Sequence, residues 1–169
     1  MAFFRVVAKL YNGLIIWLAV IGGAIFGLMA FFIGADVLMR NLTGSGLAWV
    51  IELTEYAMYV ATIFAAPWVL REGAHVSVDV VTANLPPNTR RWVAVFTNLL
   101  GSAICFTIFY YSLLSTWTAY VRGNQIYKTF TIPEWWVNGF VPLGMLLVGI
   151  EFLLLAKVWL VHPATLSAR

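Results

Sequence analysis

Long apolar stretches alternate with short polar ones along the whole chain. A helix of about 20 residues rises about 30 Å, which is the thickness of the hydrocarbon core of a bilayer. The pattern therefore predicts membrane-spanning helices instead of a water-soluble fold. The four predicted spans cover residues 13–37, 56–70, 92–121 and 135–161.

The second predicted span, residues 56–70, is short for a perpendicular crossing of the membrane. The preceding residues 47–55 mix apolar and acidic side chains and include Trp49. Tryptophan is enriched where the membrane meets water. We therefore expect an amphipathic arm over residues 47–55, anchored at the interface by Trp49.

Polar connections join the spans. The Gly-rich turn at 41–46 should end the first helix, with Ser45 or Gly46 as the N-cap of the next. Residues 76–83 predict a short surface helix, because an unpaired strand edge beside lipid would be costly. Residues 122–134 form a polar loop before the fourth span.

Composition supports the same fold class. The chain has 169 residues, of which 62% are hydrophobic and only 10% charged, whereas soluble domains are about 25% charged. We predict an all-α integral membrane protein with one four-span domain over residues 1–169. The net charge of +3 comes from basic residues scattered at span ends, which argues against a nucleic-acid partner and leaves membrane lipids as the surroundings.

The distribution of basic residues predicts the orientation, because cytoplasmic loops carry an excess of Lys and Arg. With the N-terminus inside, four spans place both termini in the cytoplasm and the predicted surface helix on the cytoplasmic side. The inside then holds seven basic residues (Arg5, Lys9, Arg71, Arg90, Arg91, Lys157, Arg169) and the outside three (Arg40, Arg122, Lys128).

Few ionisable residues lie near the spans, and each is a candidate for function. Asp36 and Arg40 are one helical turn apart, which predicts a local ion pair. Glu52 and Glu55 lie near a helix start, where docking to another subunit or simple solvation accounts for them. Glu151 falls near the inner interface, and we hypothesise that it pairs with Arg71.

The sequence gives little support for a metal or haem site. His75 and Asp79 share a helical spacing, but two ligands are too few for a structural metal site. A bis-histidine haem would need histidines inside the spans, and His75 and His162 lie at or beyond span ends. We expect no catalytic residue, no metal and no cofactor.

An ordered set of short motifs resembles one known family. The motifs are Asp36-Val-Leu-Met-Arg40, Trp49-Val-Ile-Glu52-Leu, Leu70-Arg71-Glu72-Gly73-Ala74-His75-Val-Ser-Val-Asp79, Leu85-Pro86 with Arg90-Arg91, Ile132-Pro133-Glu134-Trp135 and Pro142-Leu-Gly144. Together they resemble the small membrane subunit, DctQ-like, of tripartite ATP-independent periplasmic (TRAP) transporters. Ala74 departs from the pattern, since an acidic or small polar residue is common there.

The resemblance implies a role that depends on partners in the bacterial inner membrane. An extracytoplasmic binding protein would deliver a small organic acid to a large, DctM-like membrane subunit that carries the substrate and sodium sites. The small subunit would pack against the large one as a scaffold. The family's distinctive residues would then shape the fold and the subunit interface; they are Asp36, Arg40, Trp49, Glu52, Arg71, His75 and Asp79, to which we add Glu151.

Three alternatives remain open. The first is the small subunit of a tripartite tricarboxylate transporter, against which the Arg71–Asp79 motif argues. The second is a membrane anchor for a respiratory oxidoreductase, which the scarcity of histidines within spans disfavours. The third is an independent channel or exporter, which would normally carry a carboxylate at the membrane midplane.

Overall fold

A computed structural model describes residues 2–72 and 86–161 of the chain. Its elements, in order, are α1 (Ala2–Thr43), α2 (Ala48–Arg71), α4 (Pro87–Arg122), β1 (Gln125–Tyr127), β2 (Thr131–Pro133), α5 (Glu134–Asn138) and α6 (Phe140–Val161). Four helical segments are long and apolar enough to cross a membrane: Lys9–Thr43, Ala48–Arg71, Asn88–Arg122 and Glu134–Val161. The predicted all-α, four-span fold class is confirmed.

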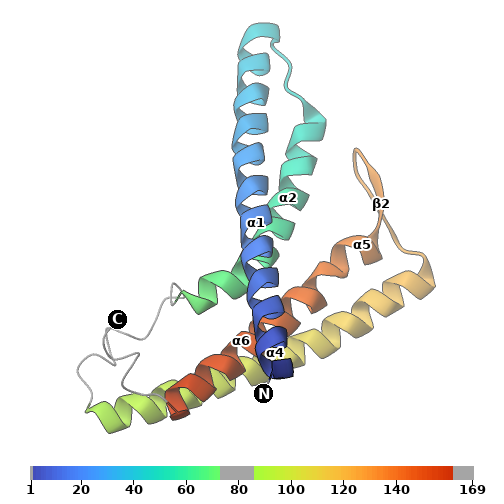
Figure 1. Cartoon of the computed structure of the whole chain (residues 1–169). Coiled ribbons are helices and arrows are strands. Elements are labelled where there is room, and N and C mark those ends of the chain that lie inside the picture. The colour runs from blue at the N-terminus through green and yellow to red at the C-terminus, as the bar shows by residue number, and fades with distance from the viewer. Residues whose placement is uncertain (1, 73–85, 162–169) are drawn as a thin grey trace.

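The helices form two pairs that diverge from a common crossing (Figure 1). In one pair α1 packs along α2, and in the other α4 packs along α6. The two pairs meet where α2 crosses α6. α2 therefore belongs to the first pair and contacts the second through α6.

Small residues line the helix crossings, because backbones approach closely only where side chains are short. A Cβ added to Gly22 of α1 would lie 3.0 Å from the Ala61 carbonyl oxygen of α2. In the second pair, Gly149 of α6 faces Cys105 of α4, and the Ser102 hydroxyl donates to the Gly149 carbonyl. These crossings contribute packing contacts, which are a principal attraction between helices in lipid.

The observed helices differ from the predicted spans at their ends. α1 begins at Ala2 and α4 at Pro87, outside the predicted apolar limits. The predicted arm, residues 47–55, is not a separate element, because α2 runs without a break from Ala48 to Arg71. Hydropathy marks only the apolar part of a helix, so it misses turns that continue into polar surroundings.

Two connections between the helices also differ from those that the sequence predicts. The polar loop at 122–134 contains a short antiparallel hairpin in which Ile126 pairs with Ile132. The N-cap of α2 is Leu47, not Ser45 or Gly46. The predicted surface helix at 76–83 lies outside the described residues.

Candidate functional site

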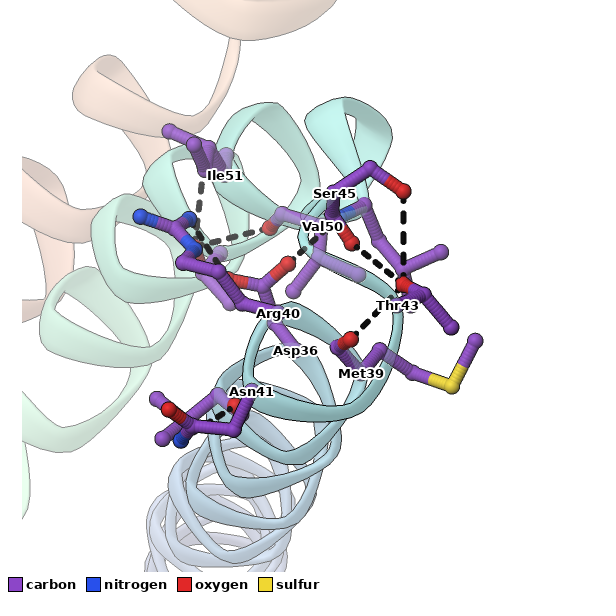
Figure 2. Close-up of polar contacts among 11 residues, drawn as sticks. Asp36, Met39, Arg40, Asn41, Thr43, Ser45, Val50 and Ile51 are labelled. Carbon is purple, nitrogen blue, oxygen red and sulfur yellow. Dashed lines mark hydrogen bonds and ion pairs between the residues drawn. The ribbon is translucent and has the colours of Figure 1, made fainter.

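Asp36 lies at the junction of α1 and α2 (Figure 2). Its carboxylate is 7% exposed and accepts a hydrogen bond from Arg40 Nη2 at 2.9 Å, so the predicted ion pair is confirmed. The second carboxylate oxygen accepts from the backbone N–H of Leu47. Asp36 therefore caps the start of α2 from the preceding helix, at an end where free N–H groups and the helix dipole favour a negative charge.

Gly46 is enclosed by this ion pair. A Cβ added there would lie 2.8 Å from Arg40 Nη2 and 3.0 Å from Asp36 Oδ1. Any larger residue at this position must displace the guanidinium or the carboxylate. A larger residue at position 46 would therefore shift the end of the exposed Arg40 side chain and disturb its ion pair with Asp36, whereas the sequence suggested Gly46 only as a cap.

Replacing Asp36 by alanine should lower the free energy of unfolding by about 1–3 kcal/mol, because both the Leu47 N–H and Arg40 lose a partner. Asparagine should lose less, since its carbonyl oxygen can still accept from Leu47. Unfolding in mixed detergent micelles measures both. Asn41→Ala is the control, because the Asn41 side chain donates to the Val37 carbonyl of its own helix. An equal loss in that variant would contradict the capping role of Asp36.

Trp49 lies in the first turn of α2 and packs edge-on against Phe32 of α1, with ring centroids 6.0 Å apart. Edge-to-face pairs of this kind contribute beyond simple burial of area. Part of the indole remains exposed. The contact ties Trp49 to α1, and its predicted anchoring at the membrane interface stays a prediction.

Glu52 and Glu55 join α2 to the hairpin. Glu52 is 4% exposed and accepts from the Phe130 backbone N–H at 3.1 Å and 3.4 Å through its two oxygens. Glu55 forms an exposed ion pair with Lys128 at 2.7 Å, and the Lys128 ammonium lies 5.6 Å from the centre of the Tyr56 ring. We call these contacts the hairpin tie. They connect the α1–α2 pair to the loop that leads from α4 into α5.

The pKa of Lys128 is raised above its ordinary value, mainly by the hydrogen bond with the Glu55 carboxylate. A raised lysine pKa means that the ion pair contributes fully below the ordinary value of 10.5 and is lost as the pH rises through the folded-state pKa. The Lys128–Glu55 pair is therefore retained at neutral pH. Because the pair is exposed, we expect its contribution to be small.

Substituting Glu52 by glutamine should loosen the hairpin, because a charge-assisted hydrogen bond to Phe130 becomes a neutral one. Amide hydrogen exchange over residues 125–133 should rise several-fold, as expected for loss of about 1 kcal/mol of local stability. Glu55→Gln should change exchange less, since its pair is exposed. Equal exchange in both variants and the parent would show that Glu52 does not hold the hairpin.

The other end of α2 is tied to α6. Arg71 Nη2 donates to Glu151 Oε1, and Glu151 is 2% exposed, so the hypothesised pairing is confirmed. Tyr11 of α1 joins them, because the Arg71 guanidinium lies 5.8 Å from the Tyr11 ring centre and the Tyr11 hydroxyl donates to the Leu147 carbonyl at 3.4 Å. We call this group the buried tie. The sequence did not single out Tyr11, whose only signal was a phenol at a span end.

Two predicted site residues, His75 and Asp79, lie outside the described residues. Within residues 2–72 and 86–161, no three His, Cys, Asp or Glu side chains gather where they could hold a metal ion. The remaining predicted residues gather in two places: Asp36, Arg40, Trp49 and Glu52 towards the end of the molecule that carries the hairpin, and Arg71 with Glu151 at the other. Their role in subunit contacts stays a prediction.

These observations define the class of protein, which is a polytopic membrane protein. Its buried polar groups bond to other parts of the same chain, and apolar side chains cover its outer faces. The chain belongs to the DctQ family, described as the DctQ component of tripartite ATP-independent periplasmic transporters, whose family model matches residues 29–161. It is thus a small permease subunit and a multi-pass protein of the bacterial inner membrane.

A curated relative is similar over most of the chain. It is the ectoine TRAP transporter small permease protein TeaB of Halomonas elongata, 28% identical over 129 residues. The match covers 76% of this chain and 66% of TeaB, slightly less than two thirds of the relative.

Proposed function

We propose that this chain is the docking scaffold of a sodium-coupled TRAP transporter that imports a small organic acid. An extracytoplasmic binding protein would deliver the acid, and a large DctM-like subunit would carry it across the membrane. The role is not catalytic. The proposed orientation keeps both termini in the cytoplasm, so the hairpin end faces outwards. The family match favours this role over a tricarboxylate-system subunit, a respiratory anchor and an independent channel or exporter.

One observation carries the proposal. Within residues 2–72 and 86–161, the three buried carboxylates, Asp36, Glu52 and Glu151, each have a partner in the chain. A carboxylate that already neutralises an arginine or caps a backbone N–H is poorly placed to bind a substrate or a sodium ion as well. The buried carboxylates of the described residues therefore stabilise the fold of this chain, which agrees with the role of a scaffold.

The outer face of α1 offers a surface for the large subunit. A Cβ added to Gly23, Gly27 or Gly34 would meet no atom within 4 Å, so these glycines are not needed for packing inside the chain. Their spacing places them on one helical face. Small residues on an open helical face allow another membrane helix to approach closely, which supports docking of the large subunit along α1.

Replacing Gly27 by leucine should weaken assembly with the large subunit while leaving this chain folded. A Cβ at this position meets no atom of the chain within 4 Å, and a leucine side chain there blocks close approach of a partner helix. We expect the yield of co-purified complex to fall about tenfold or more, corresponding to at least about 1.4 kcal/mol. Gly22→Leu is the contrasting variant, since it should disturb the chain itself through Ala61. Normal complex yield for Gly27→Leu would exclude α1 as the docking face.

The function as a whole is tested by reconstitution. The chain together with its large subunit and binding protein should support sodium-driven uptake of the substrate into vesicles. Vesicles that contain this chain alone should take up none. Sodium-driven uptake by the chain alone would overturn the scaffold role, whereas uptake by the complex in the absence of a sodium gradient would overturn only the coupling.

A further inference from the structure

Two arginines of α4 lie against the end of α6, where the start of one helix runs beside the end of the other (Figure 1). Arg91 Nη2 donates to the carbonyl of Leu160, which is in the last turn of α6 and has no acceptor role within its own helix. The Arg90 guanidinium lies over the Trp159 ring, 5.9 Å from its centre. Contacts with α6 therefore hold both arginine side chains in place.

The contact with Trp159 leaves the donors of Arg90 available for an anion. The attraction between a cation and an aromatic ring uses no hydrogen bond, so the five N–H groups of the guanidinium are not consumed by it. Arg90 forms no ion pair with any residue of 2–72 and 86–161. The planar fork of a guanidinium matches the oxygens of a phosphate, and the ring beneath it limits the freedom that binding would cost.

This end of the α4–α6 pair is positively charged. α4 contains no acidic residue, and the only acid of α6, Glu151, is already paired with Arg71. Arg90 and Arg91 also fall in the first two turns of α4, where the helix dipole disfavours cations. An anion is therefore favoured here, whereas the ammonium of a zwitterionic lipid would meet no unpaired carboxylate on these two helices.

Both arginines lie at the level of the lipid headgroups. Arg90 is close to the start of the span Asn88–Arg122, and Trp159 is close to the end of the span Glu134–Val161. Trp92 lies at the same end of α4, and tryptophan gathers where the membrane meets water. Lipid phosphates lie at this level too, so a phosphate of the surrounding membrane reaches Arg90 at its usual depth. The position favours a lipid over a soluble anion.

We propose that the Arg90 guanidinium, held over Trp159, binds the phosphate of one phosphatidylglycerol molecule. The phosphate oxygens accept from Arg90, and the charge of Arg91 adds to the attraction. In the proposed orientation the site lies in the cytoplasmic leaflet, where basic pockets between spans suit anionic headgroups. The proposal does not rest on the transport role, because it concerns groups within this chain alone.

Native mass spectrometry tests the proposal on the full chain, reconstituted in vesicles of phosphatidylethanolamine with a minority of phosphatidylglycerol and then extracted in mild detergent. We expect one retained phosphatidylglycerol per chain. Arg90→Gln should reduce its retention about tenfold, because charge-assisted hydrogen bonds to the phosphate are lost. Arg122→Gln is the matched control, since it removes the same charge from an exposed arginine at the opposite end of α4 and should retain the lipid normally.

A second variant tests the role of the ring. Trp159→Leu keeps both arginines but removes the surface that holds Arg90, and it should reduce retention about threefold. Loss of lipid in Arg90→Gln but not in Arg122→Gln supports the site, and Trp159→Leu decides if Arg90→Gln does not fold. Equal retention in all variants, an equal loss in Arg122→Gln, or preferential retention of phosphatidylethanolamine overturns the proposal. Displacement of the lipid by millimolar inorganic phosphate would also overturn it, in favour of a site for a soluble anion.

Discussion

Replacing Arg71 by methionine should destabilise the protein by about 3–5 kcal/mol, because it breaks a buried ion pair. The substitution keeps an unbranched side chain of similar length but leaves the Glu151 carboxylate buried without a counter-charge. It also removes the cation that lies on the Tyr11 ring, so α1, α2 and α6 all lose a contact. Reversible unfolding in mixed micelles measures the loss, and the yield of complex with the large subunit should fall with it.

A double variant separates the charge effect from packing. Arg71→Met combined with Glu151→Leu removes both charges and should recover most of the lost stability, because no uncompensated ion remains. Exchanging the two residues, Arg71→Glu with Glu151→Arg, should recover part of it if the site accepts the reversed geometry. If the double variant is as unstable as Arg71→Met alone, the pairing of the two charges does not account for the stability that the buried tie contributes.

Replacing Gly144 by leucine should separate α2 from α6 and prevent folding into the observed arrangement. Even the Cβ of alanine would lie 2.4 Å from Ile63 Cγ2, a distance that requires the Ile63 side chain or one of the two helices to move. The Ile63 carbonyl also faces Gly144, and Pro67 leaves that carbonyl without its usual helical donor. We expect a loss of about 1–3 kcal/mol for alanine and more for leucine.

Gly27 provides the matched control for stability, since a Cβ there meets nothing within 4 Å. Gly27→Ala should change unfolding by only a few tenths of a kcal/mol, in the stabilising direction, because glycine is the poorer helix former. Cross-linking between cysteines placed on α2 and α6 reports the crossing directly. Unchanged cross-linking in Gly144→Leu would show that the two helices do not depend on this contact.

Much of the fold follows from local rules. The spans are visible as apolar runs, and the Asp36–Arg40 pair follows from helical spacing alone. The pairing of Arg71 with Glu151 was accessible for a different reason: two opposite charges at the same depth of an apolar environment have few other partners. In these cases the physical constraint acts within a helix or along the membrane normal, and both can be read from one sequence.

The remaining contacts depend on how helices meet, which hydropathy does not encode. Nothing in residues 41–47 indicates that the cap of α2 comes from Asp36, because the contact joins two helices. The bond from Phe130 to Glu52 spans 78 residues and depends on a hairpin in a segment that reads as a polar loop. The sequence also could not predict that the two helix pairs diverge, because a helix face that contacts lipid and one that contacts protein have similar compositions.

The contacts of α2 with α1 and with the later helix α6 have a consequence for the biosynthesis of the protein. Three residues of α2, Glu52, Glu55 and Arg71, leave the ribosome well before their partners do. Arg71 and Glu151, for example, are 80 residues apart. The hairpin partners of Glu52 and Glu55 follow at residues 128–130, but Arg71 lacks its partner until the last span, which carries Glu151, has been inserted. We expect nascent chains truncated before Glu151 to depend on the insertion machinery and to be degraded, so completion of the fourth span acts as a checkpoint in the biogenesis of this protein.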